Sequence, residues 1–136
     1  MEDTVTDKQR LIVGISGASG IAYGVKILQL LQPTAIETHL VMSRSAELAL
    51  GYEMDTQLAD VHSLADKVHS IKNVGASISS GSFPTMGMVV APCSVRSMSE
   101  IAYGISSTLL TRAADVVLKE RRKLVLMIRE TPLHTG

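Results

Sequence analysis

Residues 11–20 read LIVGISGASG, and this stretch decides the fold. Leu11–Ile15 is a β-branched apolar run that ends at glycines, which is typical of a buried strand. Apolar residues then recur at helical spacing over 21–31, so we expect a helix after the turn, with Ser19 placed to cap its start. A strand, a glycine-rich turn and a helix in this order begin an alternating α/β chain.

The same alternation continues to the end of the sequence. Further strands are predicted over the apolar runs Glu37–Met42, Gly87–Ala91 (broken by Pro92) and Leu124–Ile128. Helices are predicted from Ser43 to about Tyr52, briefly within 55–74, and twice between Pro92 and Leu124, the second with the apolar stripe of Leu110–Leu118. This order predicts a three-layer, doubly wound parallel sheet of the Rossmann-like or flavodoxin-like kind.

Composition limits the classes of function. With 136 residues the chain has room for one domain, which we place at 10–136 after a polar tail at 1–9. Equal numbers of basic and acidic residues, 13 of each, and 3% aromatic residues argue against a nucleic-acid partner. We expect no membrane span, no metal site and a cytoplasmic location, because apolar runs are short, the histidines lack ligand spacing and 1–10 does not resemble a signal peptide.

The turn Gly14–Gly20 has the spacing GxxGxxG. Glycines let the backbone approach a ligand, and the amides and dipole of the following helix favour an anion. The pattern is neither the GxGxxG of dinucleotide folds nor a P-loop, since no Gly-Lys-Ser/Thr follows. An ordinary strand-to-helix turn explains it as well, so the motif alone leaves ligand binding open.

Serines follow the next two strands at their carboxyl ends. Ser43 follows the second, and the loop Ser94–Ser97 follows the third. In a doubly wound sheet the carboxyl ends of the strands border the ligand, so these loops and the glycine turn should converge. We expect both helix capping and ligand contacts from Ser43 and Ser94. Cys93 is interpreted as a small buried hydrophobe, because the sequence indicates no base beside it.

Two further segments carry weaker signals. Arg129-Glu130 follows the last predicted strand, where the pair would hold an anion and supply a proton, or would form a surface ion pair. Residues 79–82 (SSGS) have the composition of a flexible surface loop.

Six ordered blocks give the whole sequence a family resemblance. They are LIVGISGASG (11–20), ETHLVMS (37–43), SISSGSF (77–83), PCS (92–94), RAADVVLKERR (112–122) and RETPL (129–133). In this order they resemble the UbiX-like flavin prenyltransferases, formerly described as aromatic acid decarboxylases. The resemblance implies a homo-oligomer that binds FMN at subunit contacts.

The activity implied by the resemblance is transfer of a dimethylallyl group from dimethylallyl phosphate to reduced FMN. The new bonds to N5 and C6 form a fourth ring, and no metal takes part. The prenylated FMN then serves a UbiD-type decarboxylase in ubiquinone biosynthesis or in aromatic acid decarboxylation.

The resemblance also implies roles for individual residues. The FMN contacts would be Gly17, Ala18, Ser19, Ser43, Ser94, Val95, Arg96, Ser97 and Arg129. The substrate phosphate would meet Ser80, Lys119 and Arg129. The catalytic set would be Ser19, Glu53, Lys119 and Glu130, with Glu130 and Ser19 moving protons.

One departure from the family pattern leaves alternatives open. Relatives continue past the RETPL block with a strand and helices that bring a Tyr and a basic residue to the substrate phosphate, so we expect this chain to be C-terminally incomplete. A flavin-binding fragment without turnover is therefore one alternative. A flavin-dependent cysteine decarboxylase is the other, although the loop after the third strand lacks the Asn of that group.

Overall fold

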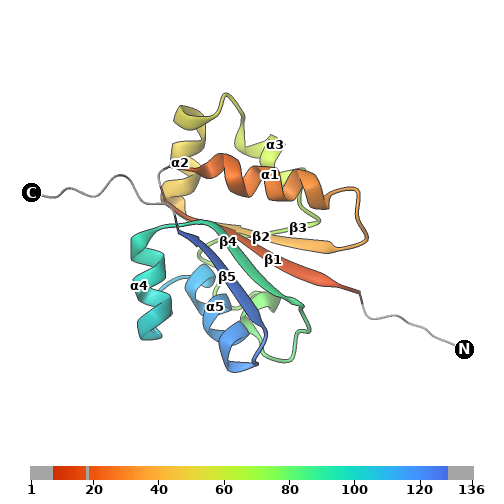
Figure 1. Cartoon of the computed structure of the whole chain (residues 1–136), viewed down its shortest axis with the longest axis vertical. Helices are drawn as coiled ribbons and strands as arrows, with labels where there is room; N and C mark the ends of the chain where they lie inside the picture. Colours follow the sequence, from red (N-terminus) through yellow and green to blue (C-terminus); the bar gives the residue numbers. More distant parts are fainter. Residues whose placement is uncertain (1–7, 18, 129–136) are drawn as a thin grey trace, which may run out of the picture.

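A computed structural model of the chain describes residues 8–17 and 19–128 as a three-layer α/β domain (Figure 1). Its sheet has five parallel strands in the order β3-β2-β1-β4-β5. The strands are β1 (Arg10–Ile15), β2 (Glu37–Met42), β3 (Lys67–His69), β4 (Gly87–Cys93) and β5 (Lys123–Ile128). The predicted doubly wound parallel sheet is confirmed.

Helices cover both faces of the sheet. They are α1 (Ile21–Leu31), α2 (Arg44–Glu53), α3 (Leu58–His62), α4 (Val95–Tyr103) and α5 (Leu109–Lys119), with a 3₁₀ turn η1 (Ser77–Ser79). Helices α1, α2 and α3 lie on one face, and α4 and α5 lie on the other (Figure 1). The chain winds outward from β1 to β3 and then returns to β4, so the strand order reverses between β1 and β4. Ligands of such folds bind outside the carboxyl ends of the strands at this point.

Neighbouring residues of β1 supply two separate cores, because side chains alternate between the faces of a strand. Ile12 packs in one cluster with Leu110 and Val117 of α5. Val13 packs in the other with Leu28 of α1. Each of these five side chains is at most 1% exposed. The central strand is therefore buried from both sides, as its apolar sequence predicts.

The structure differs from the sequence prediction in two strands. β3 was not predicted, because it has only three residues and stands within a polar stretch that also contains α3. β4 continues through Pro92 to Cys93, whereas we expected Pro92 to end it. The pairing of β4 with β5 shifts register between Val90 and Cys93. Such an irregularity accommodates a residue that has no N–H to donate.

Helix α1 lies unusually close to β4. A Cβ atom added to Gly24 would lie 2.3 Å from the carbonyl oxygen of Ala91 and 2.6 Å from the side chain of Ile15. Only glycine allows this approach. The contact seats α1 directly over the pair of strands at which the order reverses.

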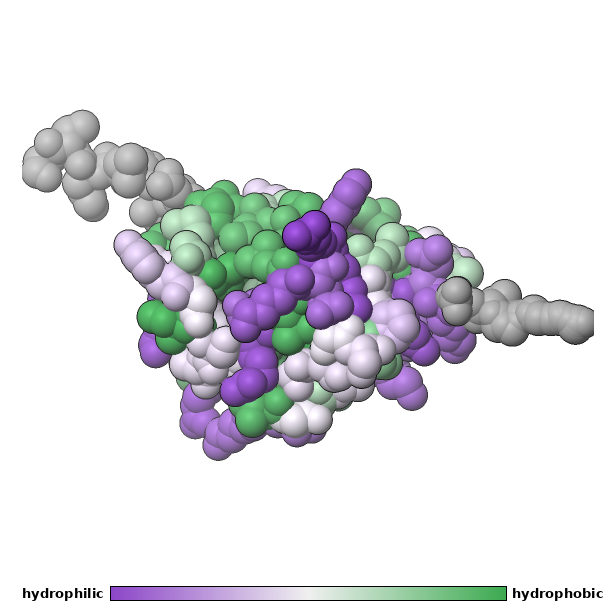
Figure 2. Space-filling model, turned by 90° about the horizontal axis from the view of Figure 1, so that it is seen from below, coloured by the Kyte–Doolittle hydropathy of each residue, from purple (hydrophilic) through white to green (hydrophobic). Residues whose placement is uncertain are grey.

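The outer strand β5 leaves apolar side chains exposed. Val125 is 58% exposed, and Met127 and Ile128 are also exposed. The space-filling view shows apolar residues gathered on part of the face that it presents (Figure 2). Among the residues described, no helix is both long and apolar enough to cross a membrane.

A histidine pair joins edge strand β3 to β2. His39 Nδ1 lies 2.9 Å from His69 Nε2, and the two rings stack with centroids 5.1 Å apart. His39 Nε2 lies 2.8 Å from Glu37 Oε1, and Glu37 also accepts hydrogen bonds from Arg10 and Lys8. The hydrogen bond with His39, followed by those from Lys8 and Arg10, lowers the pKa of Glu37 to about 2 against the opposing effect of burial.

The pKa of His69 is lowered, first by burial and then by the charges of His39 and Lys67. The unfolded chain therefore binds a proton at this residue at a higher pH than the folded chain does. It follows that neutral His69 contributes to the free energy of unfolding above the ordinary histidine pKa of about 6.5, and that this contribution is lost as the pH falls below that value.

We expect the free energy of unfolding to decrease between pH 7.5 and pH 5.5, and His69→Gln to flatten that dependence, because a glutamine amide can donate to His39 without titrating. Urea unfolding at the two pH values measures this. His62→Gln, which removes a histidine outside the pair, is the matched control and should keep the wild-type slope. An unchanged slope in His69→Gln would contradict the assignment.

Candidate active site

A buried serine joins the loops at the point where the strand order reverses. Ser16 is fully buried, and its Oγ accepts a hydrogen bond from the N–H of Ser94 at 2.9 Å. The same hydroxyl donates to the carbonyl of Pro92 at 3.3 Å, and the N–H of Ser16 donates to that carbonyl at 3.0 Å. The turn after β1 and the loop after β4 are therefore held together.

Gly17 brings the glycine turn against Ser94. Its φ is 102°, a left-handed backbone conformation, and an added Cβ would lie 3.3 Å from Ser94 Cβ. Glycine adopts this φ without strain, and its lack of a side chain leaves the backbone open to an approaching group. The sequence prediction that these two segments converge is confirmed.

Two helices begin at this end of the sheet with serine caps. Ser43 Oγ accepts the N–H of Ala46 at 3.1 Å, and Ser94 Oγ accepts the N–H of Ser97 at 3.1 Å. Both predicted caps are confirmed. The N–H of Ser43 also donates to the carbonyl of Ile15 at 2.9 Å, which ties the start of α2 to the end of β1. The first amides of a helix have no partner inside it, so α2 and α4 offer donors and positive dipole ends to an anion.

The start of α1 is different. Its N-cap is Gly20, which has no side chain of its own to cap the helix, so the predicted cap by Ser19 is wrong. The carboxylate of Glu53 takes that place, because it accepts the N–H of Gly20 at 2.7 Å and that of Ala22 at 3.3 Å. An internal anion thus occupies the amides of α1, and those of α2 and α4 are left for a ligand.

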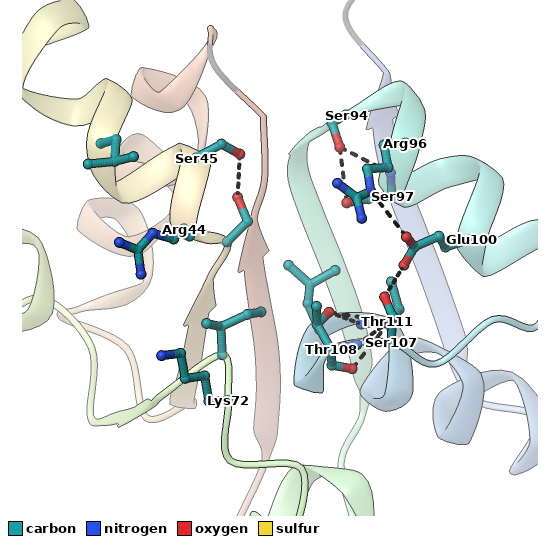
Figure 3. Close-up of a pocket in the computed structure, with 14 residues that line it drawn as sticks. Arg44, Ser45, Lys72, Ser94, Arg96, Ser97, Glu100, Ser107, Thr108 and Thr111 are labelled. Atoms are coloured by element: carbon teal, nitrogen blue, oxygen red, sulfur yellow. Dashed lines mark hydrogen bonds and ion pairs between the residues drawn. The ribbon is translucent and has the colours of Figure 1, made fainter.

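A cavity of about 500 Å³ opens between the starts of α2 and α4 (Figure 3). Its polar wall consists of Ser43, Arg44, Ser45, Lys72, Ser94, Arg96, Ser97, Glu100, Ser107, Thr108 and Thr111. Its apolar wall consists of Leu48, Ile71 and Leu110. Three cationic side chains and one carboxylate give this lining a net positive charge. Small-molecule sites typically have volumes of about 300–1,000 Å³, so the cavity has the size of a small-molecule site, and its positive charge favours an anionic ligand.

Four of the predicted FMN residues line this cavity, namely Ser43, Ser94, Arg96 and Ser97. Gly17 lies against Ser94 at its border. Val95 and Ser19 are exposed and are not part of the lining. Ala18, Arg129 and Glu130 lie outside the described residues.

Ser80 and Lys119 lie elsewhere. Lys119 ends α5 and forms an ion pair with Asp115 at 3.0 Å, about 12 Å along the helix from the cavity-lining Thr111. The loop that contains Ser80 reaches the same end of α5, where Arg122 donates to the carbonyl of Gly81 at 2.8 Å. Their phosphate-binding roles therefore stay predictions, and within one subunit these residues do not meet the cavity.

Sequence reasoning missed most of the charged lining. Arg44 directly follows the predicted Ser43 cap, and that position could have identified it. Lys72 follows the unpredicted β3, so no signal pointed to it. Thr108 and Thr111 cap the start of α5 reciprocally, which places hydroxyls at the cavity. Burial raises the pKa of the Cys93 thiol to about 11, in agreement with its interpretation as a buried hydrophobe.

Comparison with known proteins agrees with this geometry. The flavoprotein family model matches residues 2–134. The flavin prenyltransferase UbiX of Neisseria meningitidis serogroup B is 60% identical over 126 residues, which are 93% of this chain and 67% of that protein. Cysteine decarboxylases such as TvaF share the fold alone, at 15% identity and a TM-score of 0.69.

Two solved structures of relatives superpose closely. The crystal structure of AnUbiX (PadA1) in complex with FMN and dimethylallyl pyrophosphate has a TM-score of 0.91 at 46% identity, over 95% of this chain and 69% of that one. A dodecameric FMN-dependent UbiX-like decarboxylase from Escherichia coli O157:H7 has a TM-score of 0.90 at 49% identity, over 93% and 69%. This chain therefore belongs to the UbiX-like flavin prenyltransferase family of flavoproteins.

Proposed function

We propose that this protein is a flavin prenyltransferase, which transfers a dimethylallyl group from dimethylallyl phosphate to reduced FMN. The main observation that supports this proposal is the cavity between two serine-capped helix starts, which Arg44, Lys72 and Arg96 line. The membership of the chain in this family supports it as well. The product is prenylated FMN for a UbiD-type decarboxylase. We place the reaction in the cytoplasm, as the sequence leads us to expect.

The residues present fit FMN. Hydroxyls of Ser43, Ser94 and Ser97, with the first amides of α2 and α4, suit the phosphate and the ribityl chain. The apolar wall suits the ring system, and the bare backbone at Gly17 allows close approach. When bound, reduced FMN would supply two acceptor atoms: N5 for the dimethylallyl carbon whose bond to the phosphate oxygen breaks, and C6 for a second carbon of the same group, which closes the ring. We propose that Glu53 fixes the turn before α1, and that Glu130 and Ser19 move protons as phosphate departs.

A second subunit completes the site in this proposal. Ser80 and Lys119 lie at the end of α5 remote from the cavity, so they can serve a flavin only in a neighbouring copy. The exposed apolar side chains of β5 give one surface for assembly. Arg129 is proposed to contact both the flavin and the substrate phosphate.

We expect Gly17→Val to weaken FMN binding at least tenfold, because any Cβ at this φ is strained and would press on Ser94. Quenching of flavin fluorescence measures the affinity. Gly51→Val is the matched control, since an added Cβ at Gly51 meets nothing within 4 Å. Equal affinity of the two variants for FMN would mean that the glycine turn does not take part in flavin binding.

Incubation with reduced FMN and dimethylallyl phosphate should yield prenylated FMN, detected by mass and by its absorption spectrum. FMN binding without turnover would favour the flavin-binding fragment. Release of carbon dioxide from a peptide with a C-terminal cysteine would favour the decarboxylase alternative instead.

If subunits share the site, co-expression of Lys119→Ala with Gly17→Val should restore activity that neither variant has alone. Random assembly of equal amounts leaves roughly a quarter of the sites with both native residues. Assays on the mixed oligomer and on each variant alone measure this. Activity of the mixture no greater than the sum of the two would mean that Lys119 does not act across a subunit contact.

A further inference from the structure

Glu100 is the one carboxylate among the described residues of the cavity wall, and it joins α4 to the connection that precedes α5 (Figure 3). Its Oε2 accepts the Nε–H of Arg96 at 3.2 Å, one turn earlier on α4. Its Oε1 accepts the hydroxyl of Ser107 at 2.6 Å, from the connection that leads into α5. The two oxygens of one side chain therefore hold partners from two segments of the wall.

The second partner separates this pair from an ordinary surface ion pair. An exposed i, i+4 ion pair contributes little to stability and holds neither side chain firmly. Here the side chain of Glu100 is only 15% exposed, whereas that of Arg96 is 86% exposed. The hydrogen bond from Ser107, followed by the interaction with Arg96, lowers the pKa of Glu100, so the carboxylate is ionised at neutral pH. The carboxylate of Glu100, which Ser107 anchors, thus holds the solvent-exposed guanidinium of Arg96.

The geometry of the bond leaves the most useful donors of Arg96 available. A guanidinium has five N–H donors, and two parallel N–H groups match the oxygens of a phosphate. Glu100 takes the Nε–H, so both terminal nitrogens stay available for other acceptors. Figure 3 shows the guanidinium on the side of α4 that faces α2, across the cavity.

Two opposing effects follow for an anionic ligand. The negative charge of Glu100 repels it, and screening by solvent weakens that repulsion at an open site. The same carboxylate orders the Arg96 side chain before the ligand arrives, so less conformational entropy is lost when the ligand binds. A phosphate on the terminal nitrogens meets the guanidinium directly and lies farther from the carboxylate, so ordering prevails.

We infer that Glu100 is a positioning residue of the flavin site, which holds Arg96 through its Nε–H so that the terminal N–H groups meet the phosphate of FMN. This inference rests on the proposed function. Ser107 has the same role, because its hydroxyl anchors the carboxylate from the connection that leads into α5.

A double-mutant cycle read with two flavins tests the inference. Fluorescence titration of FMN and of riboflavin, which lacks the phosphate, is carried out on the wild type, Glu100→Gln, Arg96→Ala and the double variant. Glutamine cannot accept from both partners, because its NH₂ group would face one of the two donors. Glu100→Gln should weaken FMN binding roughly three- to tenfold and change riboflavin binding less than twofold. In the Arg96→Ala background, Glu100→Gln should not change the affinity for FMN any further.

Glu47→Gln controls for charge, since it removes one negative charge from α2, which borders the cavity, and should not weaken FMN binding. Three results would overturn the inference: unchanged or tighter FMN binding in Glu100→Gln, an equal loss for riboflavin, or a loss that persists without Arg96. Wild-type protein that binds neither flavin would instead refute the proposed function, and this inference with it.

Discussion

The hydroxyl of Ser16 is the contact on which the site depends. The chain leaves β1 and β4 toward opposite faces of the sheet, so no local structure joins the two loops. Ser16 joins them by accepting the amide of Ser94 and donating to the carbonyl of Pro92. A buried amide that loses such a partner costs about 1–3 kcal/mol, so the bridge strongly favours one arrangement of the loops. The left-handed turn at Gly17 and the start of α4 take their positions from it.

The three helices that directly follow β1, β2 and β4 begin at this end of the sheet, and their different capping indicates where we expect an anion to bind. Glu53 already neutralises the start of α1, although that helix follows the glycine-rich turn. Serine hydroxyls cap α2 and α4 without adding charge, so the dipoles of those two helices act together with Arg44, Lys72 and Arg96. The anion is therefore expected beside the second and fourth strands, with the glycine turn as a close-fitting border.

The sequence predicted features with a local cause and missed those that need tertiary contacts. The apolar run of β1 and the serines before α2 and α4 carry their own signals, so the sheet, the caps and the convergence of the loops were predicted correctly. β3 is only three residues long and is held by the pairing of His69 with His39, which no periodicity reveals. Glu53 at the start of α1 and the hydrogen bond from Ser107 to Glu100 also depend on tertiary contacts, because neither pair of residues is joined by a local spacing in the sequence.

Hydrogen–deuterium exchange with and without FMN tests most directly whether the flavin binds between the starts of α2 and α4. The account predicts slower exchange on FMN addition in peptides that contain 43–47 and 94–98, with little change at the remote β1 end near residue 10. FMN that binds without protecting either helix start would contradict it.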